Sequence, residues 1–517
     1  MSAGQQRWQV AGAYAAVGLL ALAGIALSGM LLQSSHSLYL AFDRSVFLQQ
    51  GWALLLAAAG VGLIGALLDG PGRARLAVLA RVLLLGLVAV GCFQVLRRSL
   101  APGFAFTTLT KLGMLGLVIG LSALAAWRLP RESFWRAAKA GCLVQLAAFA
   151  MQPGALSYLA ASLPAWSTQP TAGSAATQAP AQRVIVVVLD EWDYELALRE
   201  GMFEQAALQP LLASGLLASQ ARPAGPNTLV SLPALLLGRR FGPVDHGGTG
   251  YLVTKSGERL DGSTATLFND AASLGVRSGV VGFFHDYCRL LPTASTCVAE
   301  PVRFFPGWSR ALMRAFKSGS DLNSVFSDFM QQWRSSFEHL RSASLELVDR
   351  NDLGLVLLHL NVPHPPLLSA DSTGPRSLGT DYANNLRLAA DFMTAVAQRV
   401  VQTKVPTVLV YTSDHWLREK QLWGAMYDSQ LGLGAGKAGK SSDQRIPLLI
   451  SFLNQASATD GLRYDKPLST TVLRSLTPEL LSGRLRSPAA LASWLDQQPS
   501  LGDVSDFADD SDGPGIH

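Results

Sequence analysis

Two apolar runs of strand length end abruptly in acidic residues, and no other feature constrains the fold of this chain as strongly. The first run is VIVVVLDEWD (Val184 to Asp193) and the second is VLVYTSDHW (Val408 to Trp416). Strands made almost wholly of Val, Ile and Leu are buried on both faces, as in a parallel sheet with helices on each side. Such sheets bind ligands at the carboxyl ends of their strands. The sequence therefore predicts an α/β domain with its chemistry where these two strands end.

Further segments extend this pattern. Other apolar runs of strand length are Val276 to Phe283, Leu353 to Leu360 and Ile446 to Phe452. Between them, Asp321 to Val348 and Asn384 to Gln402 repeat apolar residues at helical spacing. Strands that alternate with helices predict a doubly wound α/β domain.

The amino-terminal part of the chain is dominated by Leu, Ala, Val and Gly and carries few charges. Its five apolar stretches are roughly Val10 to Gln33, Gly51 to Leu68, Leu76 to Leu96, Lys111 to Trp127 and Ala138 to Leu159. Each is near the ~20 residues that cross the hydrocarbon layer of a bilayer. Arginines follow the second and fourth stretches, which favours a cytoplasmic amino terminus. Five crossings from an inside start would deliver the rest of the chain to the outer side.

We therefore expect a transmembrane helical domain at residues 1–161, a linker at 162–182, an extracytoplasmic catalytic domain at 183–500 and a disordered acidic tail at 501–517. The linker is rich in Ser, Thr, Ala, Pro and Gln, which is typical of a flexible tether. The expected location is the cytoplasmic (inner) membrane, with several passes through the lipid bilayer and the catalytic domain on the periplasmic or extracellular side. The net charge of +5 comes largely from arginines beside the spans, so nucleic acid is not an expected partner.

Cys288 and Cys297 lie close together in the sequence, with Pro292 between them. In a domain outside the cytoplasm, such a pair is expected to form a disulfide.

The ends of the two strands supply candidate metal ligands. Asp190 and Glu191 stand side by side after the first strand, and Asp414 and His415 follow the second. Carboxylate and imidazole groups bind hard or borderline divalent cations. Either segment alone is also what an ordinary strand-ending turn with solvated acids looks like.

A third segment, NTLVSLPALLLG (Asn227 to Gly238), offers two candidate nucleophiles, Thr228 and Ser231. A hydroxyl is a poor nucleophile at neutral pH, so it needs an adjacent base or a metal ion. Ser231 can instead cap a helix whose first turn contains Pro233. A helix that begins just after Thr228 would point backbone N–H groups at an anionic substrate.

The order of these segments, together with HLNVPHPP (His359 to Pro366), resembles the sulfatase-like branch of the alkaline phosphatase superfamily. The pattern is most similar to the multi-span members that include lipid A phosphoethanolamine transferases and lipoteichoic acid synthases. The resemblance implies five spans before an extracytoplasmic catalytic domain of that fold. It implies that Thr228 is the nucleophile, and that His364 contacts the substrate phosphate or a second metal.

The same resemblance implies that the metal ligands come from Asp190 or Glu191 and from Asp414 with His415. Many relatives add a later histidine, but none occurs here between His415 and His517, and Arg445 stands in that neighbourhood as a candidate substrate-binding residue. One divalent ion is therefore expected, and Zn, Mn and Mg all remain open.

The expected function is metal-dependent transfer of a phospho-alcohol group to a cell-envelope lipid or glycan, through a covalent threonyl intermediate. A membrane lipid would be the donor. Two alternatives stay open: a membrane-bound hydrolase of phosphoric or sulfuric esters from the same superfamily, and a non-catalytic scaffold. The C-x-P-x-R pattern of sulfatases is absent from the sequence, which argues against a sulfatase proper.

Overall fold

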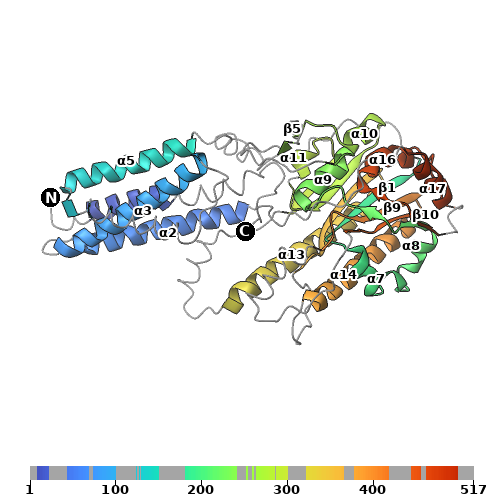
Figure 1. Cartoon of the computed structure of the whole chain (residues 1–517), viewed down its shortest axis with the longest axis horizontal. Helices are drawn as coiled ribbons and strands as arrows, with labels where there is room; N and C mark the ends of the chain where they lie inside the picture. The colour runs from blue at the N-terminus through green and yellow to red at the C-terminus, as the bar shows by residue number, and fades with distance from the viewer. Residues whose placement is uncertain are drawn as a thin grey trace.

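The computed structural model describes residues 8–22, 44–68, 74–100, 121, 124, 127–128, 130–150, 181–240, 252–253, 259–260, 263–285, 287–300, 322–365, 378–417, 444–455 and 461–498. Most of the predicted linker, the whole predicted tail and most of the fourth predicted span lie outside these residues. The described part comprises a set of amino-terminal helices and an α/β domain (Figure 1).

The core of the α/β domain is an eight-stranded sheet with the order β11-β2-β10-β9-β1-β8-β6-β7. Its strands, in that order, are Leu462–Tyr464, Gly215–Ala218, Leu448–Leu453, Thr407–Ser413, Arg183–Asp190, Leu355–Pro363, Ser278–Phe283 and Thr296–Glu300. β10 pairs antiparallel with β9 and with β2, and every other pairing in this sheet is parallel. The α/β class predicted from the sequence is confirmed, with a mixed sheet.

Helices cover both faces of this sheet (Figure 1). One face carries α13 (Leu322–Val348) and α14 (Leu378–Thr403), and the other carries α9 (Thr228–Leu237), α10 (Leu267–Ser273), α16 (Leu473–Leu481) and α17 (Pro488–Gln497). The side chains of β1 alternate between the two cores, since Val184, Val186 and Val188 pack on the α9 side and Ile185, Val187 and Leu189 on the α14 side. This two-sided burial explains why β1 has no polar residue between Arg183 at its start and Asp190 at its end.

Shorter elements connect these layers. The short helices are α7 (Tyr194–Arg199), η2 (Met202–Glu204), α8 (Gln209–Ala213), α11 (Tyr287–Leu290) and η4 (Thr470–Val472). Two-stranded sheets form between β3 (Ala221–Arg222) and β12 (Leu468–Ser469), and between β4 (Leu252–Val253) and β5 (Arg259–Leu260).

The amino-terminal helices include α2 (Arg44–Leu68), α3 (Ala74–Leu100) and α5 (Arg131–Ala150). They pack around buried side chains that include Tyr14, Leu84 and Phe134. Among the described residues, no helix combines the length and the apolar character needed to cross a membrane. The five crossings predicted from the sequence are therefore not confirmed.

Candidate metal and nucleophile site

The sheet register brings the two acidic strand ends together. β1 and β9 run parallel with Leu189 opposite Ser413, so the next residues, Asp190 and Asp414, leave the sheet side by side. On its other edge β1 pairs with β8, and that register shifts between Leu189 and Asp190. Adjacent parallel strands thus place a carboxylate from each at the carboxyl edge, as the sequence pattern predicts.

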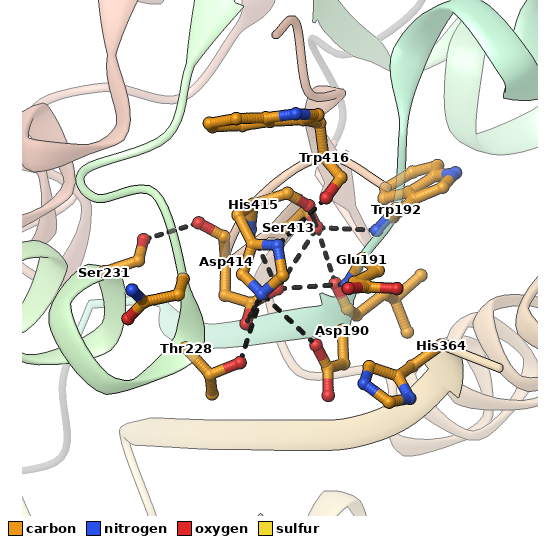
Figure 2. Close-up of polar contacts among 12 residues, drawn as sticks. Asp190, Glu191, Trp192, Thr228, Ser231, His364, Ser413, Asp414, His415 and Trp416 are labelled. Atoms are coloured by element: carbon orange, nitrogen blue, oxygen red, sulfur yellow. Dashed lines mark hydrogen bonds and ion pairs between the residues drawn. The ribbon is translucent and has the colours of Figure 1, made fainter. Parts of the chain in front are cut away.

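Asp190, Asp414 and His415 form a buried group that could hold a metal ion, with one ligand atom of each within 4.8 Å of the others. Nε2 of His415 lies 3.3 Å from Oδ2 of Asp414 and 3.8 Å from Oδ1 of Asp190. In Figure 2 these side chains converge on the His415 ring. All three side chains are at most 1% exposed.

The tautomer of His415 shows why this group fits a cation. Nδ1 lies 2.9 Å from the carbonyl oxygen of Trp416, and a carbonyl only accepts hydrogen bonds, so Nδ1 carries the proton. Nε2 then faces two buried carboxylates, and in the deprotonated ring it can offer a lone pair to a cation. A ring nitrogen fixed in this way by a backbone carbonyl is the usual arrangement of a metal-binding histidine. Two buried carboxylates this close together favour a positive charge between them, since burying uncompensated charge is costly, and a divalent cation fits that requirement.

Thr228 is the first residue of α9, and its hydroxyl reaches this group. Thr228 Oγ1 lies 3.2 Å from Nε2 of His415. The helix begins here because Asn227 caps it, accepting from the N–H of Val230 at 3.1 Å. The first turn of α9 therefore faces the same edge of the sheet as the two carboxylates (Figure 2).

Ser231, the other candidate nucleophile, has a different role in the structure. It is not the helix cap, because Asn227 fills that position. Its hydroxyl donates to the backbone carbonyl of Asp414 at 2.5 Å, so it is already engaged in a buried contact. Of the two hydroxyls, Thr228 is the one that approaches His415.

Glu191 lies outside the group formed by Asp190, Asp414 and His415. Its backbone takes part instead, since its N–H donates to Oδ1 of Asp414 at 3.1 Å. Its φ of 60° puts it in the left-handed region, which is unusual for a residue other than Gly. Of the two acids that the sequence left open, the geometry favours Asp190 as the ligand.

The two predicted substrate-binding residues lie in different surroundings. His364 follows β8 and is half-buried, with its ring tilted against that of Trp333 at 5.1 Å between centroids. In the view of Figure 2 it is drawn next to Asp190. Arg445 precedes β10, where its guanidinium pairs with Glu195 at 2.8 Å and lies over the ring of Tyr194. These contacts give Arg445 a structural setting, and its predicted role in substrate binding stays a prediction.

Two buried histidines next to the site were not predicted as functional. His285 Nε2 lies 2.8 Å from the carbonyl oxygen of Thr228, to which it donates. His359 Nδ1 lies 3.0 Å from the carbonyl of Phe283 and 2.8 Å from the hydroxyl of Tyr287. For His359, the sequence does show a histidine within the apolar run of β8, which is unusual for a buried strand. The residues that it contacts come from distant segments, so its place next to the site could not be predicted.

Charge and burial determine the ionisation of these groups. Burial opposes ionisation of Asp414, but His415, His359, the Thr228 hydroxyl and the Glu191 N–H outweigh it and lower its pKa to about 2. Burial lowers the pKa of His359 from its usual 6.5 to about 4, although Asp414 and the Phe283 carbonyl act against this change. At neutral pH the carboxylate is therefore charged and the His359 ring is neutral.

The lowered pKa of His359 predicts a loss of stability in mild acid. Between pH 6.5 and about 4, His359 binds a proton in the unfolded chain but not in the folded chain. The contribution of the neutral His359 ring to the free energy of unfolding is therefore complete above pH 6.5 and disappears toward pH 4. The loss is on the order of 3 kcal/mol. Asp414 stays ionised throughout this range. Denaturant unfolding of the metal-free protein at a series of pH values should show this slope in the wild type, and a clearly shallower slope in His359→Gln. Equal slopes in the two proteins would show that His359 is not the group that causes the loss of stability.

A disulfide joins Cys288 and Cys297, with Cα atoms 5.5 Å apart. It links α11 to β7, next to the segment that carries Tyr287 and His285.

No family model and no curated protein matches the sequence. Solved structures do match. The C-terminal periplasmic domain of EcEptC from Escherichia coli, in complex with Zn, is similar at 14% identity and a TM-score of 0.34, over 60% of this chain and 84% of that chain. The lipoteichoic acid synthase LtaP from Listeria monocytogenes is similar at 12% identity and a TM-score of 0.37, over 59% and 72%. The phosphonate monoester hydrolase of Agrobacterium radiobacter is similar at 11% identity and a TM-score of 0.37, over 58% and 73%. At such low identities and TM-scores, the overall likeness does not decide the activity.

Proposed function

We propose that this protein is a metal-dependent phosphotransferase that uses Thr228 as its nucleophile. The observation that carries the proposal is the convergence of the Thr228 hydroxyl with Nε2 of His415 beside the buried carboxylates of Asp190 and Asp414. A divalent cation held by these three side chains would lower the pKa of a coordinated hydroxyl and offset charge that develops on phosphoryl oxygens.

The transfer would take two steps. In the first, the Thr228 hydroxyl loses its proton to water and its oxygen forms a bond to the phosphorus of the donor, while the bond from phosphorus to the donor's ester oxygen breaks and that oxygen takes a proton from water and leaves as an alcohol. In the second, an acceptor hydroxyl loses its proton to water and forms the new bond to phosphorus, while the Thr228 oxygen leaves and regains a proton from water. We expect the backbone N–H groups at the start of α9 that precede Val230, whose own N–H donates to Asn227, to bind the phosphoryl oxygens, and we expect His364 to contact them as well.

We propose a membrane lipid as donor and an envelope lipid or glycan as acceptor. Support comes from the amino-terminal helices, whose large apolar side chains are exposed: Leu56 is 65%, Leu63 60% and Leu83 59% exposed. Apolar surface of this kind is what a lipid bilayer covers. Attachment to the cytoplasmic membrane, with the α/β domain on its outer side, belongs to the same proposal.

Intermediate trapping tests this function. Full-length protein in vesicles that contain a phospholipid labelled in its head group should acquire a phospho-alcohol adduct, and peptide mass mapping should locate it on Thr228. Thr228→Ala should carry none. Label that then moves to an envelope lipid or glycan supports the transferase, whereas label released to water indicates a hydrolase. A wild-type protein that never carries the adduct would contradict the covalent mechanism.

A further inference from the structure

The backbone of the turn that follows Asp190 is fixed by hydrogen bonds to side chains. Its successive backbone N–H groups each donate to a side chain: Glu191 to Oδ1 of Asp414 at 3.1 Å, Trp192 to the Ser413 hydroxyl at 2.7 Å, and Asp193 to the Tyr382 hydroxyl at 2.9 Å. Two of these side chains come from the end of β9. The third, Tyr382, comes from α14.

The turn needs this support because of Glu191. This residue has a φ of 60°, a conformation that costs free energy for a residue with a side chain. Such a conformation persists only when the surrounding contacts impose it. If the Glu191 peptide relaxed to an ordinary conformation, the direction of the preceding residue, Asp190, would change as well.

Tyr382 is the contact that bridges this peptide. Its hydroxyl donates to the carbonyl of Glu191 at 2.7 Å while it accepts from the N–H of Asp193. The side chain is fully buried, and this burial, with the nearby acids, raises the pKa of Tyr382 well above its usual value. The hydroxyl therefore keeps its proton and can make both hydrogen bonds at any physiological pH. One turn further along α14, Asn385 donates to the carbonyl of His364 at 3.0 Å, so the same helix also supports the loop after β8.

We propose that Tyr382 is a positioning residue for the metal group: by fixing the left-handed turn at Glu191, its hydroxyl aims the Asp190 carboxylate at Asp414 and His415. This inference rests on the proposed function, because it requires that the group binds a metal. Residues that orient metal ligands typically change metal affinity by about 10-fold to 100-fold when they are altered. Tyr382→Phe should therefore raise the Kd for Zn²⁺ by roughly that factor.

Tyr411 supplies a matched control. It is also fully buried, packs in the same core as Tyr382, and its hydroxyl donates to a backbone carbonyl of α14, that of Met393, at 2.9 Å. Tyr411→Phe removes the same atom from a similar environment, away from the Asp190 turn. The two variants should lose comparable stability in denaturant unfolding, so a difference in metal affinity cannot come from general destabilisation.

The test compares Zn²⁺ affinity by chelator competition for the full-length wild type, Tyr382→Phe and Tyr411→Phe. Weaker binding in Tyr382→Phe alone supports the inference. Hydrogen exchange of the metal-free proteins should agree, with faster exchange at residues 190–194 in that variant only. If the wild type binds Zn²⁺ and Tyr382→Phe binds it equally well, the inference fails and the proposed function stands. If the wild type binds no divalent metal at all, both fail.

Discussion

Replacing Thr228 with alanine should lower turnover by about 10⁴-fold or more, because it removes the atom that would form the covalent intermediate. The structure gives no substitute at this position, since the nearby Ser231 hydroxyl is engaged with the Asp414 carbonyl. Thr228→Ser keeps a hydroxyl at the start of α9 and should retain activity well above that of the alanine variant. Loss of the labelled head group from the donor phospholipid, in the presence of acceptor, measures the turnover of all three proteins.

Ser231→Ala is the matched control for this prediction. It deletes a hydroxyl from the same turn of the same helix, at a cost of about 1 kcal/mol for the lost hydrogen bond. It should leave the adduct on Thr228 and most of the turnover in place. If Ser231→Ala abolished turnover while Thr228→Ala did not, the nucleophile would be misassigned.

Asp190→Asn should lower metal affinity by more than about 100-fold, because loss of a residue that only orients a metal ligand already costs about 10-fold to 100-fold. Glu191→Gln should change the metal affinity by only a few-fold. The reason is geometric. Asp190 contributes a ligand atom within 4.8 Å of those of Asp414 and His415, and Glu191 contributes through its backbone, which glutamine preserves. Both substitutions remove one negative charge from adjacent positions, so the comparison separates ligation from net charge.

Metal content after dialysis and chelator competition measure this pair directly. Circular dichroism on the metal-free variants checks that both are folded. Equal loss of metal in the two variants would mean that metal affinity depends only on the total charge of the site. Loss confined to Glu191→Gln would mean that Glu191, and not Asp190, is the metal ligand.

The residues that the sequence could predict are those whose neighbours along the chain determine their position. Asp190 directly follows an unbroken apolar run and Asp414 follows another after Thr412 and Ser413, so both had to stand at the carboxyl edge of a sheet. Pairing of the two strands then brought them together. A helix in this segment was predictable from the apolar stretch that Gly238 ends, although it begins at Thr228 and not after Ser231.

The choice between Asp190 and Glu191 depends on contacts made across the fold. It is decided by the left-handed φ at Glu191, which Asp414 and Tyr382 impose from segments 223 and 191 residues away. The predicted helix cap, Ser231, was wrong, because Asn227 is also a residue type that caps helices and it takes that position in the structure. The place of His359 next to the site could not be predicted, because the residues that it contacts, Phe283 and Tyr287, belong to other elements. From the sequence alone it is one more residue of a buried strand.

The setting of Arg445 was not predictable for the same kind of reason. Its place before β10 suggested the site, but Glu195 and Tyr194 from α7 bind its guanidinium. For the amino-terminal part, composition predicted helices and the structure has them, while the crossings themselves stay a prediction.

Anomalous diffraction from crystals grown with Zn²⁺ or Mn²⁺ tests the central claim most directly. We expect a single anomalous peak bounded by Asp190, Asp414 and His415, with the Thr228 hydroxyl within bonding distance of the ion. A peak elsewhere, or a Thr228 side chain turned away from an occupied site, would contradict the account.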